Sequence, residues 1–291
     1  METFFLIWCI LKHGSIVMIL IAASSKDVAS LNIAGQILRH YSFDETTENF
    51  QGNPIYIARV NDRNVKLVTL KEELVYAQNV TEFFAGLELI VFISRHSSIS
   101  GTPTLSVHTP GNLSEAELGG LPRRVSVSPA NTMRDALKAM VQFKEEVHLN
   151  YEVSYECTHH GPSINVPAMF AELGSSPKQW NDSKAAEVVA HATMKAISKF
   201  GKSQAKAVLG IGGPHYSEKF TRIALENEIA FGHMIPKYAI PCIDAEVLRQ
   251  CVEKTLERVE FAVLDWKGIK GEHKSKTVEM LKEMGLPIQR V

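Results

Sequence analysis

The stretch IVMILIAA (residues 16–23) decides the fold class that we predict for this chain. Its length and unbroken apolar character are typical of a strand that is buried on both faces of a sheet. A polar loop follows it, and VASLNIAGQILRHY (28–41) then repeats apolar residues at the spacing of an amphipathic helix. A buried strand, a polar loop and a helix in succession form the unit from which α/β folds are built.

The same alternation continues along the chain. Further strands are expected at LELIVFIS (87–94), TLSVH (104–108), VHLNYEVSYECT (147–158), PAMFAELG (167–174), KAVLGIGG (206–213) and EFAVLDW (260–266), with helices at 184–200 and 217–228. The interleaved order predicts a three-layer αβα fold around a mostly parallel or mixed sheet. We expect one α/β domain over residues 18–291, because no linker or repeat divides it, and residues 1–17 as an extension outside that domain.

Composition narrows the class of protein further. Apolar residues make up 45% of the 291 residues and charged residues 22%, with a formal net charge of −1. These values are typical of a folded globular protein. They argue against a strongly basic nucleic-acid-binding protein, so any contact with nucleic acid has to depend on local patches.

Cysteines and apolar runs bear on the cellular location. None of the four cysteines, Cys9, Cys157, Cys242 and Cys251, forms a CxxC pair, which argues against a cysteine zinc site and a disulfide scaffold. The two apolar runs near the N-terminus both fall short of the ~20 residues that span a bilayer. We therefore expect a cytoplasmic protein without a membrane partner.

Histidines gather in the loops that follow the predicted strands. His96, His159, His160 and His215 lie in such loops, and His108 ends the short strand at 104–108. In open α/β sheets, ligands bind at the carboxyl ends of the strands. Neutral imidazole binds zinc, and an imidazole with a pKa near neutrality can transfer protons. The alternative for each histidine is a structural role in a turn or a cap.

The segment YECTHHGPSINVP (155–167) combines several of these side chains. In an extended strand His159 and His160 would point to opposite faces, so both can contact one ligand only if the chain turns at Gly161-Pro162. Glu156 is either part of the same site or lies on a solvated strand face. The segment lacks the H-E-x-x-H spacing of helical zinc sites, so a zinc site here would be assembled from separate loops.

Two other loops carry candidate binding residues. GIGGPHYSEKF (210–220) is neither a dinucleotide-binding fingerprint nor a P-loop, but its glycines would let a ligand approach the backbone. A tight turn without a ligand is the alternative. The lysine-rich WKGIKGEHKSK (266–276) could contact phosphates, or it could be a solvated loop.

Four stretches together resemble one known family: SRHSSISGTPTLSVHTPGN (94–112), YEVSYECTHHGPSINVPAMFAELGSSPKQWND (151–182), GIGGPHYSEKFT (210–221) and GHMIPKYAI (232–240). They look like the D-aminoacyl-tRNA deacylases of the archaeal and plant type. The resemblance implies hydrolysis of the ester between a D-amino acid and the 3′ end of tRNA. It also implies zinc as cofactor, and a phosphorylase- or hydrolase-like α/β fold akin to that of peptidyl-tRNA hydrolases.

The resemblance, together with the chemistry of ester hydrolysis, suggests roles for particular residues. We expect the catalytic residues to be His96, Glu156, His159 and His160. The expected metal ligands come from the set His96, His108, His159, His160 and His215. The expected substrate-binding residues are Lys26, Arg95, Ser97, Gly212, Gly213, Tyr216 and Lys267, with Arg95 and Lys267 facing the terminal phosphates of the tRNA.

Alternatives to this reading remain open at the level of the sequence. One is a nucleoside phosphorylase or a metal-dependent peptidase on a similar fold. Another is a tRNA-binding protein without catalytic activity. The expected partner is tRNA charged with a D-amino acid, bound at its acceptor end, and the expected state is a monomer or a small homo-oligomer.

Overall fold

The computed structural model describes residues 17–291, and the predicted extension therefore lies, apart from Val17, outside the described residues. The first strand, β1 (Met18–Ser24), begins where the sequence predicts and is buried along its whole length. Helix α2 (Val28–His40) follows it, and the carboxylate of Asp27 accepts a hydrogen bond from Ser30 N at the start of this helix. In the apolar stripe predicted for α2, Ile33 and Ile37 are buried, whereas Leu31 is exposed.

The larger of the two sheets is mixed. Its eight strands lie in the order β2 (Asp44–Phe50), β3 (Asn53–Val60), β4 (Arg63–Leu70), β1, β5 (Leu87–Arg95), β8 (Ala168–Gly174), β6 (Thr104–His108) and β7 (Glu152–Tyr155). Strands β4, β1, β5 and β8 are parallel, while β2 and β3 join them as antiparallel hairpins. Strands β6 and β7 are parallel to each other but antiparallel to β8. This reversal determines how the functional residues meet.

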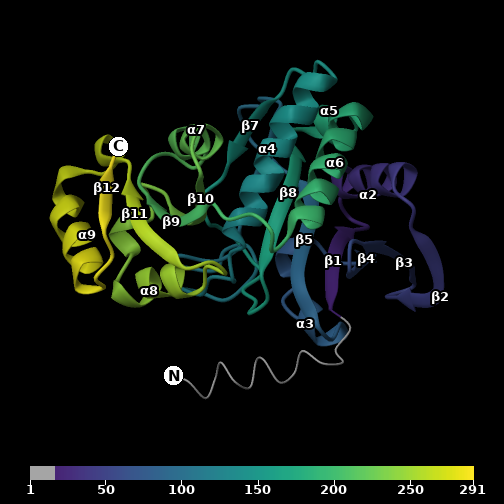
Figure 1. The fold of residues 1–291 in the computed structure, drawn as a ribbon, viewed down its shortest axis with the longest axis horizontal. Coiled ribbons are helices and arrows are strands. Elements are labelled where there is room, and N and C mark those ends of the chain that lie inside the picture. The colour runs from purple at the N-terminus through teal and green to yellow at the C-terminus, as the bar shows by residue number, and fades with distance from the viewer. Residues whose placement is uncertain (1–16) are drawn as a thin grey trace.

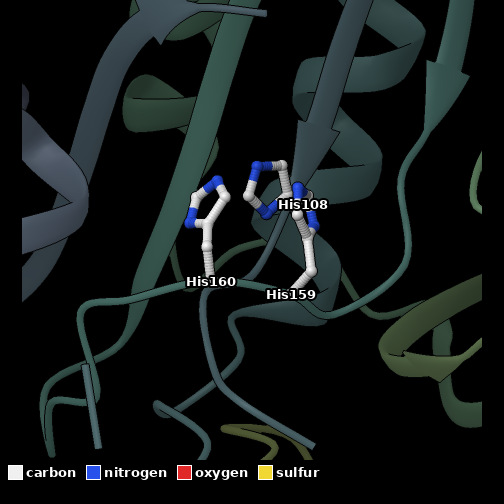
Figure 2. A group of neighbouring side chains, drawn as sticks. All are labelled: His108, His159 and His160. Atoms are coloured by element: carbon white, nitrogen blue, oxygen red, sulfur yellow. The ribbon is translucent and has the colours of Figure 1, made fainter. Parts of the chain in front are cut away.

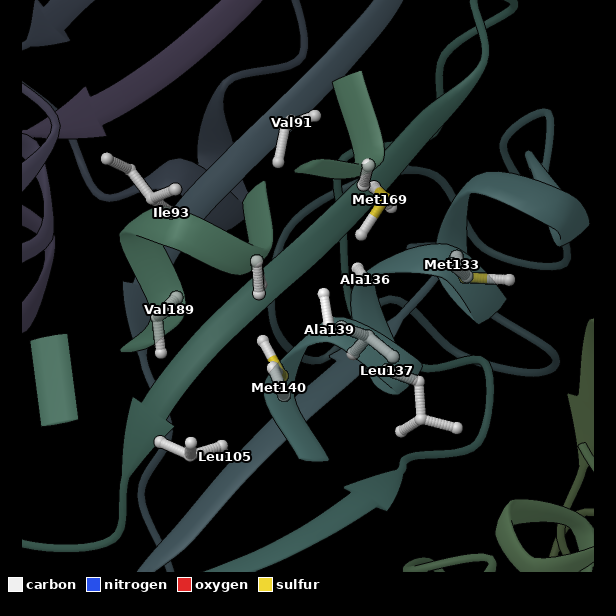
Figure 3. Packing of buried hydrophobic residues seen from close by; sticks show 14 of the residues in the cluster. Val91, Ile93, Leu105, Met133, Ala136, Leu137, Ala139, Met140, Met169 and Val189 are labelled. Carbon is white, nitrogen blue, oxygen red and sulfur yellow. The ribbon is translucent and has the colours of Figure 1, made fainter. Parts of the chain in front are cut away.

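The two faces of this sheet are covered differently (Figure 1). Helices α2, α4 (Ala130–Glu146) and α6 (Ser183–Lys199) cover one face, where side chains such as Val91, Met140 and Val189 form the main core (Figure 3). On the other face, the part of the chain that the structure describes places the short helices η1 (Leu74–Tyr76) and α3 (Val80–Phe83) and several loops over a smaller apolar cluster. Polar side chains on this second face therefore have room for a site.

The smaller sheet is entirely parallel and follows the predicted three-layer pattern. Its strands lie in the order β10 (Ile229–Ile235), β9 (Lys206–Ile211), β11 (Val259–Leu264) and β12 (Ile288–Arg290). Helix α7 (Glu218–Glu226) packs on one face, and α8 (Ala245–Glu253) and α9 (Gly271–Glu283) pack on the other. The short helices α5 (Pro177–Trp180), η2 (Ile240–Cys242) and η3 (Trp266–Gly268) complete the described elements.

The predicted fold class is confirmed, because mixed and parallel sheets are flanked by helices. The sequence did not indicate that the strands divide into two sheets, nor that residues 44–70 form hairpins. The main core contains residues of both sheets, Val91 of β5 and Val208 of β9 among them, so the two sheets share apolar packing. Within residues 17–291, no helix is long and apolar enough to cross a membrane.

Candidate active site

The candidate site lies on the face of the large sheet that the long helices leave free. Ser94 of β5 and Ser106 of β6 both pair in register with Glu172 of β8, and the side chains of all three are buried. Because β6 and β7 are antiparallel to β5 and β8, their carboxyl ends, which carry His108 and Glu156, point to the opposite end of the sheet from the carboxyl end of β5, which carries His96. The expectation that ligands bind at the carboxyl ends of the strands therefore accounts for His96. The other residues of the site come together on one face of the sheet.

Three histidines form the first half of the site, and Figure 2 shows their rings facing one another. The ring centroids of His108 and His159 are 4.3 Å apart, those of His108 and His160 are 4.8 Å apart, and those of His159 and His160 are 4.3 Å apart. His159 and His160 reach the same ligand space because His160 has a left-handed backbone with φ of 42°. Left-handed backbone is uncommon for a non-glycine residue, and it often occurs at functional sites.

The hydrogen bonds of these rings indicate which nitrogens are free. His159 Nδ1 lies 2.8 Å from the carbonyl oxygen of Cys157, and His160 Nδ1 lies 2.8 Å from that of Gly161. A carbonyl oxygen can only accept, so each Nδ1 carries the proton and each Nε2 keeps its lone pair. His108 Nε2 is buried and has no hydrogen-bond partner. Ring nitrogens of the three residues lie within 4.8 Å of one another, as in a group that could hold a metal ion.

The surroundings keep the imidazoles of His159 and His160 neutral. Burial lowers the pKa of His160 to about 4, and the neighbouring His108 adds to this effect. Burial and repulsion from His160 and His108 hold the pKa of His159 well below its usual value. A neutral imidazole is the protonation state that binds a metal ion.

A charged group forms the second half of the site. His96 Nδ1 lies 3.1 Å from Glu156 Oε1 and 3.5 Å from Glu172 Oε2, and all three side chains are almost fully buried. Burial by itself would lower the pKa of His96, but the two carboxylates outweigh it and raise the pKa to about 11. The pKa of Glu156 lies well below its usual value, because hydrogen bonds from His215 and His96 outweigh burial. His96 is therefore an imidazolium between two carboxylates.

His215 connects Glu156 to the loops of the smaller sheet. Its Nε2 lies 2.9 Å from Glu156 Oε2, and its Nδ1 lies 3.1 Å from the hydroxyl of Tyr238 and 3.3 Å from Cys157 Sγ. Burial would lower the pKa of His215, but contacts with Cys157 and Glu156 outweigh it and raise the pKa to about 10. The hydroxyl of Tyr216 lies 2.8 Å from His96 Nε2. His96 and His215 therefore each have polar partners at both ring nitrogens.

An open cavity of about 360 Å³ leads to both groups. Its walls include Arg95, Ser97, Leu118 and Tyr216, and Glu73 stands at its side. The guanidinium of Arg95 lies 2.6 Å from Glu73 Oε1 and its carbon lies 5.7 Å from the centre of the Trp180 ring. The cavity thus offers a cation and aromatic surface near a site rich in imidazole.

The structure gathers most, but not all, of the predicted site residues. The predicted residues that line the cavity are Arg95, His96, Ser97, Glu156, His159, His160, His215 and Tyr216, and His108 stacks against His159. Lys26 is exposed and offers its carbonyl oxygen to Arg95. Gly212 and Gly213 line a separate small crevice with Asp265, and Lys267 follows in the same loop as Asp265.

Three residues of the site were not predicted from the sequence. Glu172 is buried, accepts a 2.5 Å hydrogen bond from the Ser94 hydroxyl, and lies 3.7 Å from His108 Nε2. The available signal was a single carboxylate inside the apolar run PAMFAELG. Cys157 and Tyr238 were also missed as partners of His215. The solvated-face alternative for Glu156 is wrong, since this residue is fully buried.

Other groups could also hold a metal ion. Cys157, His159 and His215 form one such group beside the histidines already described, and His96, Glu156 and Glu172 form another. A further group, His40, Glu187 and His191, lies on α2 and α6 at the other face of the sheet. Only the group of His108, His159 and His160 consists entirely of imidazoles within the described part of the chain.

Fold and site together define an α/β enzyme whose histidines and carboxylates converge beneath an open cavity. The chain belongs to the D-aminoacyl-tRNA deacylase family, whose model matches residues 83–289. It is 36% identical to D-aminoacyl-tRNA deacylase of Thermococcus onnurineus over 276 residues, covering 93% of this chain and 98% of the relative. It is 37% identical to the Methanosarcina mazei protein of the same name over 277 residues, covering 93% and 91% of the two chains.

A solved structure agrees with the fold over nearly the whole chain. The crystal structure of a conserved protein of unknown function, AF0625, is 30% identical and superposes with a TM-score of 0.83, covering 94% of this chain and 95% of that one. The relatives confirm the family that the sequence motifs indicated.

Proposed function

We propose that this chain hydrolyses the ester bond between a D-amino acid and the 3′ end of tRNA, releasing the free D-amino acid and the tRNA. The names of the relatives support the substrate. The observation that carries the chemistry is the convergence of His108, His159 and His160 beside an ion-paired carboxylate, Glu156. Ester hydrolysis needs an activated water and a group that stabilises the developing oxyanion, and such a site can supply both.

Zinc is the metal that we propose for the histidine group. Neutral imidazole is a common zinc ligand, and catalytic zinc sites generally have three protein ligands and one open position. The Nε2 atoms of His108, His159 and His160 form no hydrogen bond with any described residue, which fits this requirement. Carboxylate oxygens of Glu172 and Glu156 lie 3.7 Å from His108 Nε2 and 3.6 Å from His159 Nε2. Bound zinc would lower the pKa of a water molecule and polarise the ester carbonyl. The backbone carbonyls that hold His159 and His160 would fix the orientation of the two rings.

The charged residues have a different role in this proposal. Glu156 is held as a carboxylate by His96 and His215, so its low pKa makes it a weak base. We therefore propose that Glu156 orients the two imidazoliums, His96 and His215, and the attacking water. His215, which lines the cavity and is about one third exposed, would donate a proton to the leaving ribose oxygen. His96 is more deeply buried and would stabilise negative charge at the reacting centre.

The proposal extends to the partner and the location. The acceptor end of a D-aminoacyl-tRNA would enter the cavity, with Arg95 at its wall facing a terminal phosphate. We propose a cytoplasmic location, where charged tRNA is present, and a monomer or small homo-oligomer as the functional state. Ser97 and Tyr216 would contact the 3′-terminal nucleotide from the cavity wall.

Removing the metal is expected to abolish hydrolysis of D-tyrosyl-tRNA. Protein treated with a chelator and then desalted should lose activity by on the order of a hundredfold or more, because the polarising metal contributes several kcal/mol to the transition state. Adding one equivalent of zinc should restore the rate, and adding magnesium should not. Release of D-tyrosine from labelled D-tyrosyl-tRNA measures the activity. Full activity after the metal content has fallen to background would refute the proposed role of zinc. The proposed deacylase activity would still stand.

The same preparation distinguishes the alternative enzymes. A nucleoside phosphorylase would consume inosine only when inorganic phosphate is present, and a peptidase would cleave an unblocked peptide. We expect neither reaction. Phosphate-dependent release of hypoxanthine, without release of D-tyrosine from the tRNA, would contradict the proposed function and identify a nucleoside phosphorylase.

A further inference from the structure

Five basic side chains lie around the carboxyl ends of the smaller sheet. The members of this cationic rim are Lys237 after β10, Lys267 and Lys270 after β11, Lys274 in the first turns of α9, and Arg290 at the end of β12. All four strands are parallel, so their carboxyl ends lie along one edge. Every member except Lys274 is exposed.

Direct contacts connect the members of the rim. Arg290 and Lys274 both lie over the ring of Trp266, with the guanidinium carbon 3.9 Å and the ammonium nitrogen 4.6 Å from its centre. The backbone N–H of Lys237 donates to the carbonyl of Gly213 over 2.9 Å. Gly213 in turn packs against Gly268, where an added side-chain carbon would come within 2.6 Å of Gly213 N. The backbone at Lys237 and the backbone next to Lys267 thus both contact Gly213.

The rim is continuous with the cavity of the candidate active site. Tyr238 follows Lys237 directly, and its hydroxyl bonds His215, which lines that cavity. Its ring lies nearly parallel to that of His215, with centroids 6.4 Å apart and 58% of the tyrosine exposed. The loop of Gly212 and Gly213 also continues into His215. Residues adjacent in the chain therefore connect the cavity to the rim at two points.

The carboxylates of Asp265 and Glu272 lie near the rim. Asp265 is buried and paired with Lys219, and Glu272 lies in the first turn of α9, 3.4 Å from His273. Among the described residues, Lys237, Lys267 and Lys270 form no ion pair within 4.0 Å. The whole chain has a net charge of only −1, so these cations are a local feature and not part of a general excess.

We propose that the cationic rim binds the phosphate backbone of the tRNA acceptor arm while the aminoacyl ester occupies the cavity. This inference rests on the proposed function and adds the surface that recognises the RNA body. Lysine side chains with no carboxylate partner release counterions when they meet phosphates. The N-terminus of α9 begins within the rim and has no side-chain cap, and Glu272 in its first turn offsets part of its positive potential. Phosphate contacts of this kind position the RNA and carry no sequence information.

The test compares two substrates and two matched double variants of the full chain. Lys267→Ala with Lys270→Ala removes two rim cations, and Lys184→Ala with Lys195→Ala removes two exposed lysines of α6 on the far side of the large sheet. The substrates are D-tyrosyl-tRNA and the short fragment in which D-tyrosine is esterified to CCA. Binding of uncharged tRNA is followed by fluorescence anisotropy at several salt concentrations.

The rim variant is expected to bind tRNA on the order of tenfold more weakly at low salt, with the slope of log K against log salt reduced by about 2. Its rate on tRNA relative to the fragment should fall by a similar factor. The control variant should keep the wild-type ratio and slope. Equal ratios and slopes in both variants would overturn the rim as the RNA surface. Failure of wild-type protein to hydrolyse either D-ester would instead overturn the proposed function.

Discussion

His160→Asn is expected to lower kcat/KM for D-tyrosyl-tRNA by on the order of a thousandfold and to remove bound zinc from the purified protein. One of three imidazoles is lost, and the amide that replaces it is a much poorer zinc ligand. Asparagine is the informative replacement because it tolerates the left-handed backbone of this position, where φ is 42°. A loss of activity therefore cannot be attributed to backbone strain.

The chain offers a matched control for this substitution. His148 also has a left-handed backbone, with φ of 52°, and lies in the loop between α4 and β7. His148→Asn should keep the wild-type rate and zinc content. Metal content by mass spectrometry and single-turnover deacylation are the two measurements. Wild-type zinc content in His160→Asn would contradict the assignment of His160 as a ligand.

Glu156→Gln is expected to lower kcat by on the order of a hundredfold and the free energy of unfolding by about 3 kcal/mol. The side chain keeps its size but loses the charge that faces His96 and His215. Both imidazoliums lose a partner in a buried site, so part of the cost of their desolvation is no longer offset. Their pKa values should fall from about 11 and about 10.

The pH dependence of stability gives this prediction a sign. A histidine whose pKa is raised in the folded protein stabilises it fully below the unfolded value of about 6.5, and this contribution is lost as pH rises through the folded value. The stability difference between wild type and Glu156→Gln should therefore be largest near pH 6 and shrink toward pH 10 to 11. Chemical denaturation across this range measures it.

Glu152→Gln is the control for Glu156→Gln. Glu152 lies four residues earlier, on the same polar face as predicted from the strand alternation, but is exposed. It should leave both the rate and the stability within error of wild type. A difference between wild type and Glu156→Gln that stays constant from pH 6 to pH 10 would show that the buried ion pairs do not hold the two histidines charged.

Local sequence patterns were sufficient to predict the elements that carry the site. The apolar runs predicted at 16–23 and 87–94 correspond to β1 and β5, since burial sets their character. Of the strand predicted at 147–158, only Glu152–Tyr155 forms a strand, because α4 extends to Glu146 and a loop follows it.

The same patterns predicted that His159 and His160 can contact one ligand only if the chain turns at Gly161-Pro162. The two rings do lie together, with centroids 4.3 Å apart, and the backbone leaves the extended conformation at His160, where φ is 42°. A shared ligand stays a prediction.

Long-range pairing could not be predicted in the same way. Glu172 looks like an interruption of a core strand, because the residues that explain it, Ser94, His96 and His108, lie more than sixty positions away. The reversed direction of β6 and β7 depends on which edge of β8 accepts them, and no local pattern records this. The rim likewise appears only when β10 and β11 pair with β9 in parallel, which places the loops of Lys237 and Lys267 at the same end of the smaller sheet.

The central claim is that the cavity hydrolyses the ester of a D-amino acid. The most direct measurement places D-tyrosyl-tRNA and L-tyrosyl-tRNA, separately labelled, in one reaction with zinc-loaded wild-type protein. We predict complete release of D-tyrosine while L-tyrosyl-tRNA decays only at its spontaneous rate. Equal rates for the two isomers, or no release of D-tyrosine above the spontaneous rate, would contradict the account.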